Sequence, residues 1–288
     1  MPAINSFFQN QEEMNAVAEL MKNAMKSSDG LAAVAAAIAA PVEAEIQHTQ
    51  VTPQLLFQHT LPVGQRAIYQ VKPLTKAFWI AEGGSVIETT VERNEVECPL
   101  YRAAAEVEID VDVLNTGNMG SLQEYQRDAA SRINRIVDKA TLDVLSAAVP
   151  AANTVSITIG EVLTEGALAE AFAFIEDQEL DVGTIVMRGS RFKDVKTWSM
   201  DYITEREWRE KGVLGKYAGA SIMRCAQAGA NEVLLLPAGY EVGKNPLRDA
   251  LQVEILPIKN NFKRSFLMWQ TLGQIVTRPQ LLAKVVIV

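Results

Sequence analysis

Residues 229–288 read GANEVLLLPAGYEVGKNPLRDALQVEILPIKNNFKRSFLMWQTLGQIVTRPQLLAKVVIV. This stretch is a series of short apolar runs interrupted by Pro, Gly and polar residues, a pattern typical of successive β-strands. The chain ends on the apolar residues VVIV at 285–288, whereas chain ends are usually polar and poorly ordered. We therefore expect the C-terminus to be tied into a sheet as its last strand.

Residues 154–256, which overlap this stretch, predict a mixed α/β unit. A strand is expected at 154–159, and a helix at 165–178 buries apolar residues at helical spacing. The run TIVMR at 184–188 is apolar without alternation, as expected for a strand covered on both faces. A helix at 190–198 and a charged surface loop at 201–212 follow. Further strands are expected at 220–224, 232–236 and 252–256.

The longest predicted helix covers residues 121–149. Ser121 and Glu124 have the spacing of a capping box, and Pro150 ends the pattern. At 1.5 Å per residue such a helix is about 40 Å long. Its apolar face includes Ile136 and Val137, and we expect it to lie across a sheet. Its polar face is predicted to contain Arg127, Asp128, Arg132, Arg135, Asp138 and Lys139.

The first sixty residues predict small helices with no obvious common core. Amphipathic spacing covers residues 11–27, an Ala-rich run covers 31–40, and Thr52-Pro53 begins another short element. We interpret 1–60 as an arm that packs on something else. The alternative is a helical layer over the chain's own sheet.

Residues 61–114 alternate apolar and polar side chains in two places, at 68–72 and at 107–113. This period of two predicts a long two-stranded excursion, with its tip at residues 76–85. An isolated two-stranded ribbon is marginally stable in water. We therefore expect the excursion to be stabilised against a neighbouring subunit.

The order of these segments resembles the major capsid proteins of tailed bacteriophages, which have the Hong Kong 97 fold. Asn261-Phe262, Arg278-Pro279 and the apolar strand at 281–287 match the family's C-terminal pattern, and IVMRGSRF (185–192) and GVLGKYAGASI (212–222) resemble its axial-domain segments. The resemblance implies an α+β fold with an N-terminal arm at 1–60 and an extended β-hairpin loop at 61–104. A peripheral domain at 105–157, with spine helix 121–149, is followed by an axial domain at 158–256. Residues 257–288 would return to the peripheral domain.

Composition limits the other functions of the chain. The net charge of −8 over 288 residues argues against a surface that grips nucleic acid through its phosphates. Cys98 and Cys225 are expected to be free thiols of a reduced compartment, with a disulfide as the alternative. Residues 1–11 lack the pattern of a signal peptide, and the apolar run 31–40 is too short to span a bilayer. We expect no membrane association.

No motif predicts catalysis, a cofactor or a metal site. His48 and His59 are too few for zinc, and GYEVGK at 239–244 departs from a phosphate-binding loop in spacing and in its last residue. Some members of the resembled family join subunits by a Lys–Asn isopeptide bond that a Glu catalyses. In the matching positions this chain has Ser265 and Leu272, so Lys76 would lack both an acceptor and a catalyst. We expect no autocatalytic crosslinking and no enzymatic activity.

The candidate functional residues are therefore subunit contacts. Exposed aromatic residues at the tip, Phe78 and Trp79, are costly unless a partner covers them; the alternative is intramolecular packing. The charged run at 92–97 is usually a solvated face, but across a subunit contact it would pair with arginines of the long helix. The full set of candidates is Lys76, Phe78, Trp79, Glu82, Glu92, Arg93, Glu95, Arg127 and Arg132.

The resemblance implies a major capsid protein that assembles into pentamers and hexamers of an icosahedral shell around the phage genome. It would enclose DNA without sequence-specific binding, assemble in the host cytoplasm and end in the virion. The expected partners are further copies of the chain, a separate scaffolding protein, a portal and a decoration protein. The alternatives are an encapsulin-like nanocompartment shell, which shares the fold, and a soluble α/β enzyme.

Overall fold

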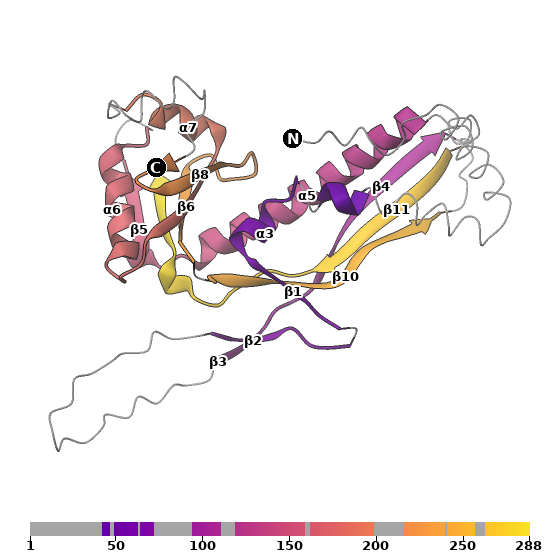
Figure 1. Cartoon of the computed structure of the whole chain (residues 1–288), viewed down its shortest axis with the longest axis horizontal. Coiled ribbons are helices and arrows are strands. Elements are labelled where there is room, and N and C mark those ends of the chain that lie inside the picture. Colours follow the sequence, from indigo (N-terminus) through magenta and orange to yellow (C-terminus); the bar gives the residue numbers. More distant parts are fainter. Residues whose placement is uncertain are drawn as a thin grey trace, which may run out of the picture. The chain divides into compact units, whose positions relative to one another are not determined.

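The structure is a computed structural model that describes residues 42–46, 49–62, 64–71, 94–110, 119–158, 162–198, 216–239, 241–256 and 263–288. The chain forms two compact units (Figure 1). Unit 1 contains the described parts of 1–50, 101–137 and 247–272, and unit 2 contains those of 51–100, 138–246 and 273–288. Helix α5 (Met119–Ala148) and strand β10 (Gly243–Ile255) contribute residues to both units.

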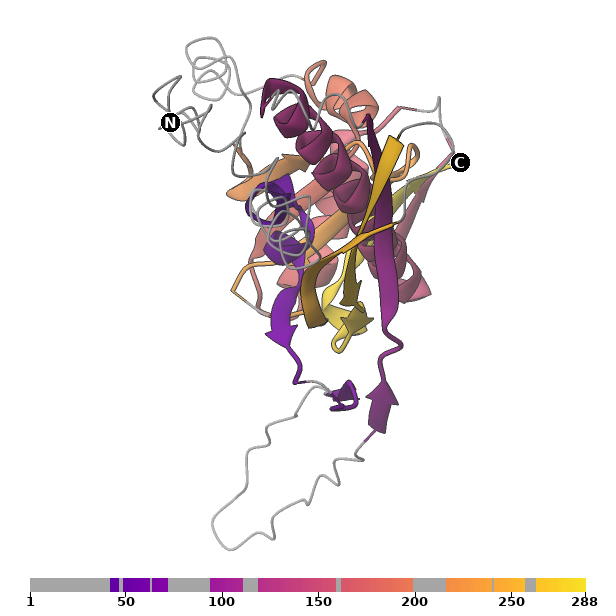
Figure 2. The ribbon, with the colours of Figure 1, turned by 90° about the vertical axis from the view of Figure 1, so that its right-hand side faces the viewer.

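Unit 1 is a sheet with a helix on one face. Strand β4 (Tyr101–Asp110) pairs antiparallel with β11 (Lys263–Leu272) along its whole length, and β11 also pairs with β10. Figure 2 shows β4 in purple and β11 in yellow running side by side. Because side chains alternate along a strand, every second residue of β4 is buried. The core contains Ala103, Ala105, Val107 and Ile109 of β4, Phe266 and Met268 of β11, and Ala129, Ala130, Ile133 and Val137 of α5.

The segment just before residue 51 packs inside its own subunit. A helical turn at 42–46 buries Val42 and Ile46 in the core of unit 1. Asn134 Nδ2 of α5 donates a hydrogen bond of 2.6 Å to the hydroxyl of Thr49. Leu55 and Leu56 lie in the core of unit 2, and β1 (Phe57–Thr60) pairs with β10. The prediction that the whole span 1–60 is an arm packing elsewhere is therefore wrong for residues 42–46 and 49–60, while residues 1–41, 47 and 48 lie outside the described part.

Unit 2 is built on a six-stranded sheet. Its strands are, in spatial order, β5 (Thr154–Ile157), β13 (Ala283–Ile287), β9 (Glu232–Pro237), β6 (Val182–Met187), β8 (Ala220–Arg224) and β7 (Lys216–Tyr217). Helices α6 (Glu165–Glu176) and α7 (Gly189–Val195) pack on one face. The other face is covered by α3 (Thr52–Leu55) and the C-terminal part of α5. The predicted double covering is confirmed for residues 184–187, because Ile185 and Val186 of β6 lie in different cores, whereas Arg188 follows the strand and is exposed.

The C-terminal strand is an interior strand of this sheet. β13 pairs in parallel with β5 and antiparallel with β9, and the backbone N–H of Val288 donates to the carbonyl of Ile157 at 2.9 Å. The expectation that the chain end is tied into a sheet is confirmed. The structure groups residues 273–288 with β9 and β5, and residues 263–272 with β4, whereas the sequence placed both in one returning span. Arg278 precedes the short 3-10 helix η3 (Pro279–Leu281), and η2 (Ala151–Asn153) follows α5.

The base of the predicted two-stranded excursion is present in unit 2. β2 (Ile68–Val71) pairs antiparallel with β3 (Asn94–Glu97). Beneath it is a small core of Leu61, Ala67, Tyr69, Cys98 and Ile275. β1 (Phe57–Thr60) and β12 (Ile275–Val276) both pair with β10. We call the paired segment the ribbon base; residues 72–93, with the predicted tip, lie outside the described residues.

Helix α5 confirms the predicted long helix, but the predicted burial of two of its residues is reversed. It begins at Met119 and ends at Ala148, against a predicted 121–149. Ile136, predicted to be buried, is 55% exposed, and Asp138, predicted on the polar face, is 5% exposed. Ile136 lies on the same stripe as Arg132 and Arg135, while Asp138 faces hydrogen-bond donors of α3. No described helix combines the length and apolar character needed to cross a bilayer.

Candidate subunit-contact surfaces

The two cysteines lie in different cores of unit 2, Cys98 beneath the ribbon base and Cys225 between α5 and the six-stranded sheet. Cys98 and Cys225 are both buried free thiols, as expected. Burial raises the pKa of Cys98 to about 11 and also raises that of Cys225, so both are protonated and unreactive at neutral pH. Within the described residues, no three His, Cys, Asp or Glu side chains converge on a common metal position. The candidate subunit-contact sites are exposed surfaces and the contacts that hold them in place.

The ribbon base exposes one complete face. Ile68 is paired with Glu97, and Gln70 with Glu95, and directly paired residues project to the same side of a sheet. All four are exposed, and Ile68 is 46% exposed although it is a large apolar residue. The face is thus a mixed apolar and acidic surface that the described residues of the subunit leave exposed.

Tyr69 fixes the opposite face of the ribbon base to the subunit. Its hydroxyl shares a hydrogen bond of 2.8 Å with Nδ1 of His59, and the two rings meet edge to face with centroids 5.8 Å apart. The Lys244 ammonium lies 5.7 Å from the Tyr69 ring and 5.7 Å from the Phe57 ring. Burial raises the pKa of the Tyr69 phenol, so the hydroxyl keeps its proton. The ring contacts and the hydrogen bond together orient the exposed face.

A close backbone approach holds the strand that leaves the ribbon base. A Cβ atom on Gly273 would lie 2.6 Å from the carbonyl oxygen of Pro99 and 2.8 Å from Sγ of Cys98. Any larger residue at 273 would push residues 98–100 away. Packing against Gly273 therefore fixes the position of residues 98–100, which connect β3 to β4.

The N-terminal part of α5 exposes the two arginines predicted as contacts. Arg127 and Arg132 are both exposed, and Arg132 pairs with Asp128 at 2.9 Å. Both partners of this ion pair are more than half exposed, so water and salt screen it and it adds little to stability. Ile136, one turn further on, adds an apolar residue to the exposed stripe.

A buried carboxylate anchors the chain where it enters unit 2. Asp138 Oδ1 accepts hydrogen bonds from the backbone N–H of Val51 (3.1 Å) and of Thr52 (3.0 Å), and from the Thr52 hydroxyl (2.9 Å). These donors include the first N–H groups of α3, which have no partner within that helix. Burial raises the pKa of Asp138, and the hydrogen bonds from Thr52 and Val51 lower it by less. Asp138 thus acts as a cap supplied from another helix.

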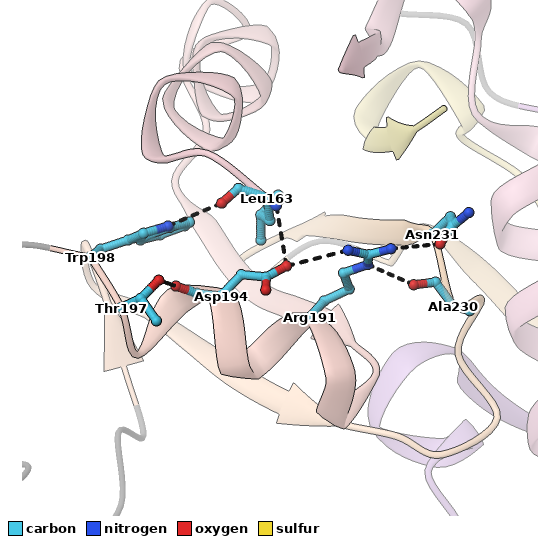
Figure 3. Close-up of polar contacts among 7 residues, drawn as sticks. All are labelled: Leu163, Arg191, Asp194, Thr197, Trp198, Ala230 and Asn231. Carbon is cyan, nitrogen blue, oxygen red and sulfur yellow. Dashed lines mark hydrogen bonds and ion pairs between the residues drawn. The ribbon is translucent and has the colours of Figure 1, made fainter. Parts of the chain in front are cut away.

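A polar network fixes helix α7 (Figure 3). Arg191 donates to the Ala230 carbonyl at 2.7 Å and to Asn231 Oδ1 at 2.6 Å, and it pairs with Asp194 at 3.4 Å. The N–H of Leu163 donates to Asp194 Oδ2 at 3.2 Å, and Trp198 Nε1 donates to the Leu163 carbonyl at 3.1 Å. The helix is therefore held to the loops before α6 and before β9. The predicted charged loop 201–212 that follows lies outside the described residues.

The structure describes three of the nine predicted contact residues, and their contacts with another subunit stay predictions. Glu95 lies exposed on β3, and Arg127 and Arg132 lie exposed on α5. Lys76, Phe78, Trp79, Glu82, Glu92 and Arg93 fall outside the described residues. Ser265 and Leu272, discussed for crosslinking, are both buried in β11. The sequence did not predict that Ile68 and Ile136 are exposed apolar residues. The only sign of this in the sequence is that each is an apolar residue beside charged or polar neighbours.

Comparison with known proteins establishes the fold. No protein-family model and no curated protein sequence matches the chain. Among solved structures, that of Microbacterium phage Oxtober96 superposes with a TM-score of 0.63 at 13% identity, covering 83% of this chain and 91% of that one. The capsid of Cyanophage P-SCSP1u gives 0.59 at 11% identity, covering 81% and 86%. The SrpI encapsulin complex of Synechococcus elongatus PCC 7942 gives 0.54 at 14% identity, covering 82% and 88%.

These similarities extend over most of both chains in each comparison. The predicted α+β capsid fold of the Hong Kong 97 type is confirmed, and phage capsids and an encapsulin both share it with this chain.

Proposed function

We propose that the chain is a phage major capsid protein that builds a closed icosahedral shell from pentamers and hexamers. The observation that carries this proposal is the similarity to phage structures over more than four fifths of this chain. Many copies of one weak contact, repeated with closed symmetry, give a stable shell. The shell would enclose the genome without sequence-specific contacts, in keeping with the net charge of −8.

The ribbon base favours assembly over an isolated subunit. Its exposed face combines Ile68 with Glu95 and Glu97, and it rests on a core of five buried residues. A neighbouring subunit that presented Arg127 and Arg132 would cover the apolar residue and pair with the carboxylates. We propose this contact between the ribbon of one subunit and helix α5 of the next. The six candidates outside the described residues would extend it along the loop.

The remaining partners follow from the same proposal. Assembly in the host cytoplasm would use a separate scaffolding protein, a portal would occupy one vertex, and a decoration protein would bind the finished shell. The virion is the final location.

Particle formation tests the proposal directly. The chain is expressed alone and together with any adjacent scaffold gene, and particle size is measured by sedimentation and negative-stain microscopy. Closed shells of hundreds of ångströms, or rings of capsomer size, are expected. A monodisperse monomer or dimer under every condition, scaffold included, would overturn the proposal.

The loop tip is tested separately with Phe78→Ala combined with Trp79→Ala. The variant is expected to fold as the wild type does but to form shells that dissociate at a lower temperature, because two interface anchors are removed. An unchanged shell melting temperature would contradict this role of the tip.

A second candidate function is an encapsulin-like nanocompartment shell. The similarity to the SrpI encapsulin complex favours it. The contents of purified particles separate the two candidates: packaged nucleic acid and neighbouring portal and terminase genes indicate a phage capsid, whereas a single copurifying enzyme from a neighbouring gene indicates a nanocompartment.

A further inference from the structure

Helix α6 and the turn after it carry most of the chain's net negative charge. Residues 162–181 contain six carboxylates and no Lys or Arg, against a net charge of −8 for the whole chain. All six are exposed, and none makes an ion pair within the described residues. Glu165 accepts a hydrogen bond of 2.9 Å from the Tyr217 hydroxyl. We call the other five the α6 acidic surface: Glu170, Glu176, Asp177, Glu179 and Asp181.

The position of these carboxylates is unfavourable for the helix itself. Glu176 is the last residue of α6, Asp177 is its C-cap, and the last turn contains no basic residue. The C-terminus of a helix carries a partial negative charge, so acidic side chains there are repelled by their own helix. Glu179 also has a positive φ of 60°, which a non-glycine residue seldom adopts. Local stability therefore does not explain the α6 acidic surface, and a positive charge from outside the helix would remove the repulsion.

Helix α7 presents the opposite charge on the same unit. Arg188 precedes α7, Lys193 lies in its last turn, and Lys196 is its C-cap. The Arg224 guanidinium of β8 lies 4.9 Å from the Phe192 ring centroid, and the Lys196 ammonium lies 5.1 Å from it. We call the exposed residues Arg188, Lys193, Lys196 and Arg224 the α7 basic surface. The Arg191 network of Figure 3 holds α7 against the loop before β9, so the backbone that carries the basic side chains of α7 has a defined position.

Within the described part of the chain, no ion pair joins the two surfaces. They are separate patches on one unit, with opposite charge. A contact between two different patches of identical subunits is heterologous, and it closes into a ring when the rotation between subunits permits. A second copy of the chain is therefore the partner that satisfies both surfaces at once.

We propose that, within a ring of subunits, the α6 acidic surface of one copy docks against the α7 basic surface of the next. The inference rests on the proposed shell function and names the surfaces that would build its capsomers. Complementary charge of this kind sets the register of docking and excludes wrong orientations, because juxtaposed like charges are strongly unfavourable.

Two charge-reversal variants test the docking. The acidic variant is Glu176→Lys with Glu179→Lys, and the basic variant is Arg188→Glu with Lys193→Glu. Each makes both surfaces alike in sign, so we expect the yield of rings and shells to fall by more than about tenfold. In the acidic variant the new lysines suit the helix C-terminus, so the subunit should melt no lower than the wild type while assembly is lost. Glu241→Lys with Glu254→Lys makes the same change of charge at other exposed positions and should assemble normally.

Rescue distinguishes charge pairing from other damage. A chain that carries all four reversals has the two surfaces exchanged in sign and should regain assembly. A mixture of the acidic variant with the basic variant should also assemble, because each supplies the surface that the other needs. In a ring the two variants would have to alternate, so even-numbered rings should form in preference to pentamers.

The outcomes separate this inference from the proposed function. If the wild type forms no rings or shells with its scaffold, the proposed function fails. If the wild type assembles and both folded variants assemble equally well, the docking inference fails and the shell function stands. Folded variants that lose assembly and are not rescued by the fourfold exchange would also overturn the inference. Loss of assembly with rescue would establish it.

Discussion

The six-stranded sheet and the ribbon base belong to the same unit, but they are stabilised in different ways. The sheet is covered on one face by α6 and α7 and on the other by α3 and α5, and its central strands β6 and β9 are buried at most positions. The ribbon base has two paired strands, a core of five buried residues and one uncovered face. The sheet has its stabilising contacts within the subunit, whereas the ribbon base exposes one face within the described part of the chain. Substitutions in the two regions should therefore affect different measurements.

The largest effect is expected in the centre of the sheet. Leu235 of β9 is 0% exposed and belongs to the core beneath α6 and α7. Leu235→Ala removes buried methyl groups and leaves a cavity, which should lower the free energy of unfolding by about 2–5 kcal/mol. Denaturant titration of the unassembled subunit measures this. Val96→Ala in the exposed ribbon base is the control and should change stability by less than about 0.5 kcal/mol. Similar losses for both variants would refute the contrast between the regions.

The next effect concerns the cap that Asp138 supplies to α3. Asp138→Ala leaves the half-buried N–H of Val51 and the buried N–H of Thr52 without their acceptor, which should cost about 1–3 kcal/mol in the free energy of unfolding. Asp138→Asn keeps an oxygen acceptor of the same shape and should cost less. Thermal unfolding of the two variants checks the order, and equal losses would show that the acceptor is not what matters.

The same residue gives a pH dependence of known sign. Because burial raises the pKa of Asp138 above its ordinary value, its contribution to stability is full below about pH 4 and is lost as the pH rises through the raised pKa. Asn does not titrate in this range. The stability of Asp138→Asn relative to the wild type should therefore improve as the pH is raised from about 4 to 7. A relative stability that falls over this range would contradict the raised pKa.

A smaller effect is expected where the ribbon base meets the rest of unit 2. Tyr69→Phe removes the hydroxyl that bonds to His59 and keeps the ring packing with Lys244. The loss should be about 1 kcal/mol in the free energy of unfolding, which is typical of one hydrogen bond. The control is Tyr101→Phe, at an exposed tyrosine, which should have no measurable effect. An equal effect of both substitutions would show that the hydrogen bond between Tyr69 and His59 does not stabilise the ribbon base.

The same comparison explains what the sequence was able to predict. Strands of the sheet are recognisable because burial on both faces requires uninterrupted apolar residues, as at 185–187 and 233–236. The long helix is recognisable because its apolar spacing continues over many turns. The base of the ribbon is recognisable from its period of two. These patterns record local burial, which a single segment of sequence can show.

Features that depend on distant segments were not predictable in the same way. Asp138 is polar, so the helical pattern placed it on the exposed face, yet it is buried because α3 supplies donors from 86 residues away. Residues 42–56 were assigned to an arm because their short helices showed no obvious common core, and only the structure shows that Val42 and Ile46 enter the core of unit 1 and that Leu55 and Leu56 enter a core of unit 2. Of the predicted contacts, Glu95, Arg127 and Arg132 are exposed as expected, but exposure alone does not identify a partner.

The substitution with the smallest expected effect on the stability of the subunit is Ile68→Ser, which should nevertheless weaken the assembled shell. Ile68→Ser replaces a half-exposed apolar residue on the uncovered face of the ribbon base. In the isolated subunit the side chain is already largely in water, so its free energy of unfolding should change by less than about 0.5 kcal/mol. In a shell that covers this face, every subunit would lose buried apolar area, and the loss is repeated at each contact. The shell should therefore dissociate at a lower denaturant concentration than the wild-type shell, while unassembled subunits of both unfold together. If subunit and shell shift by the same amount, Ile68 acts within its own subunit and the ribbon base needs no partner.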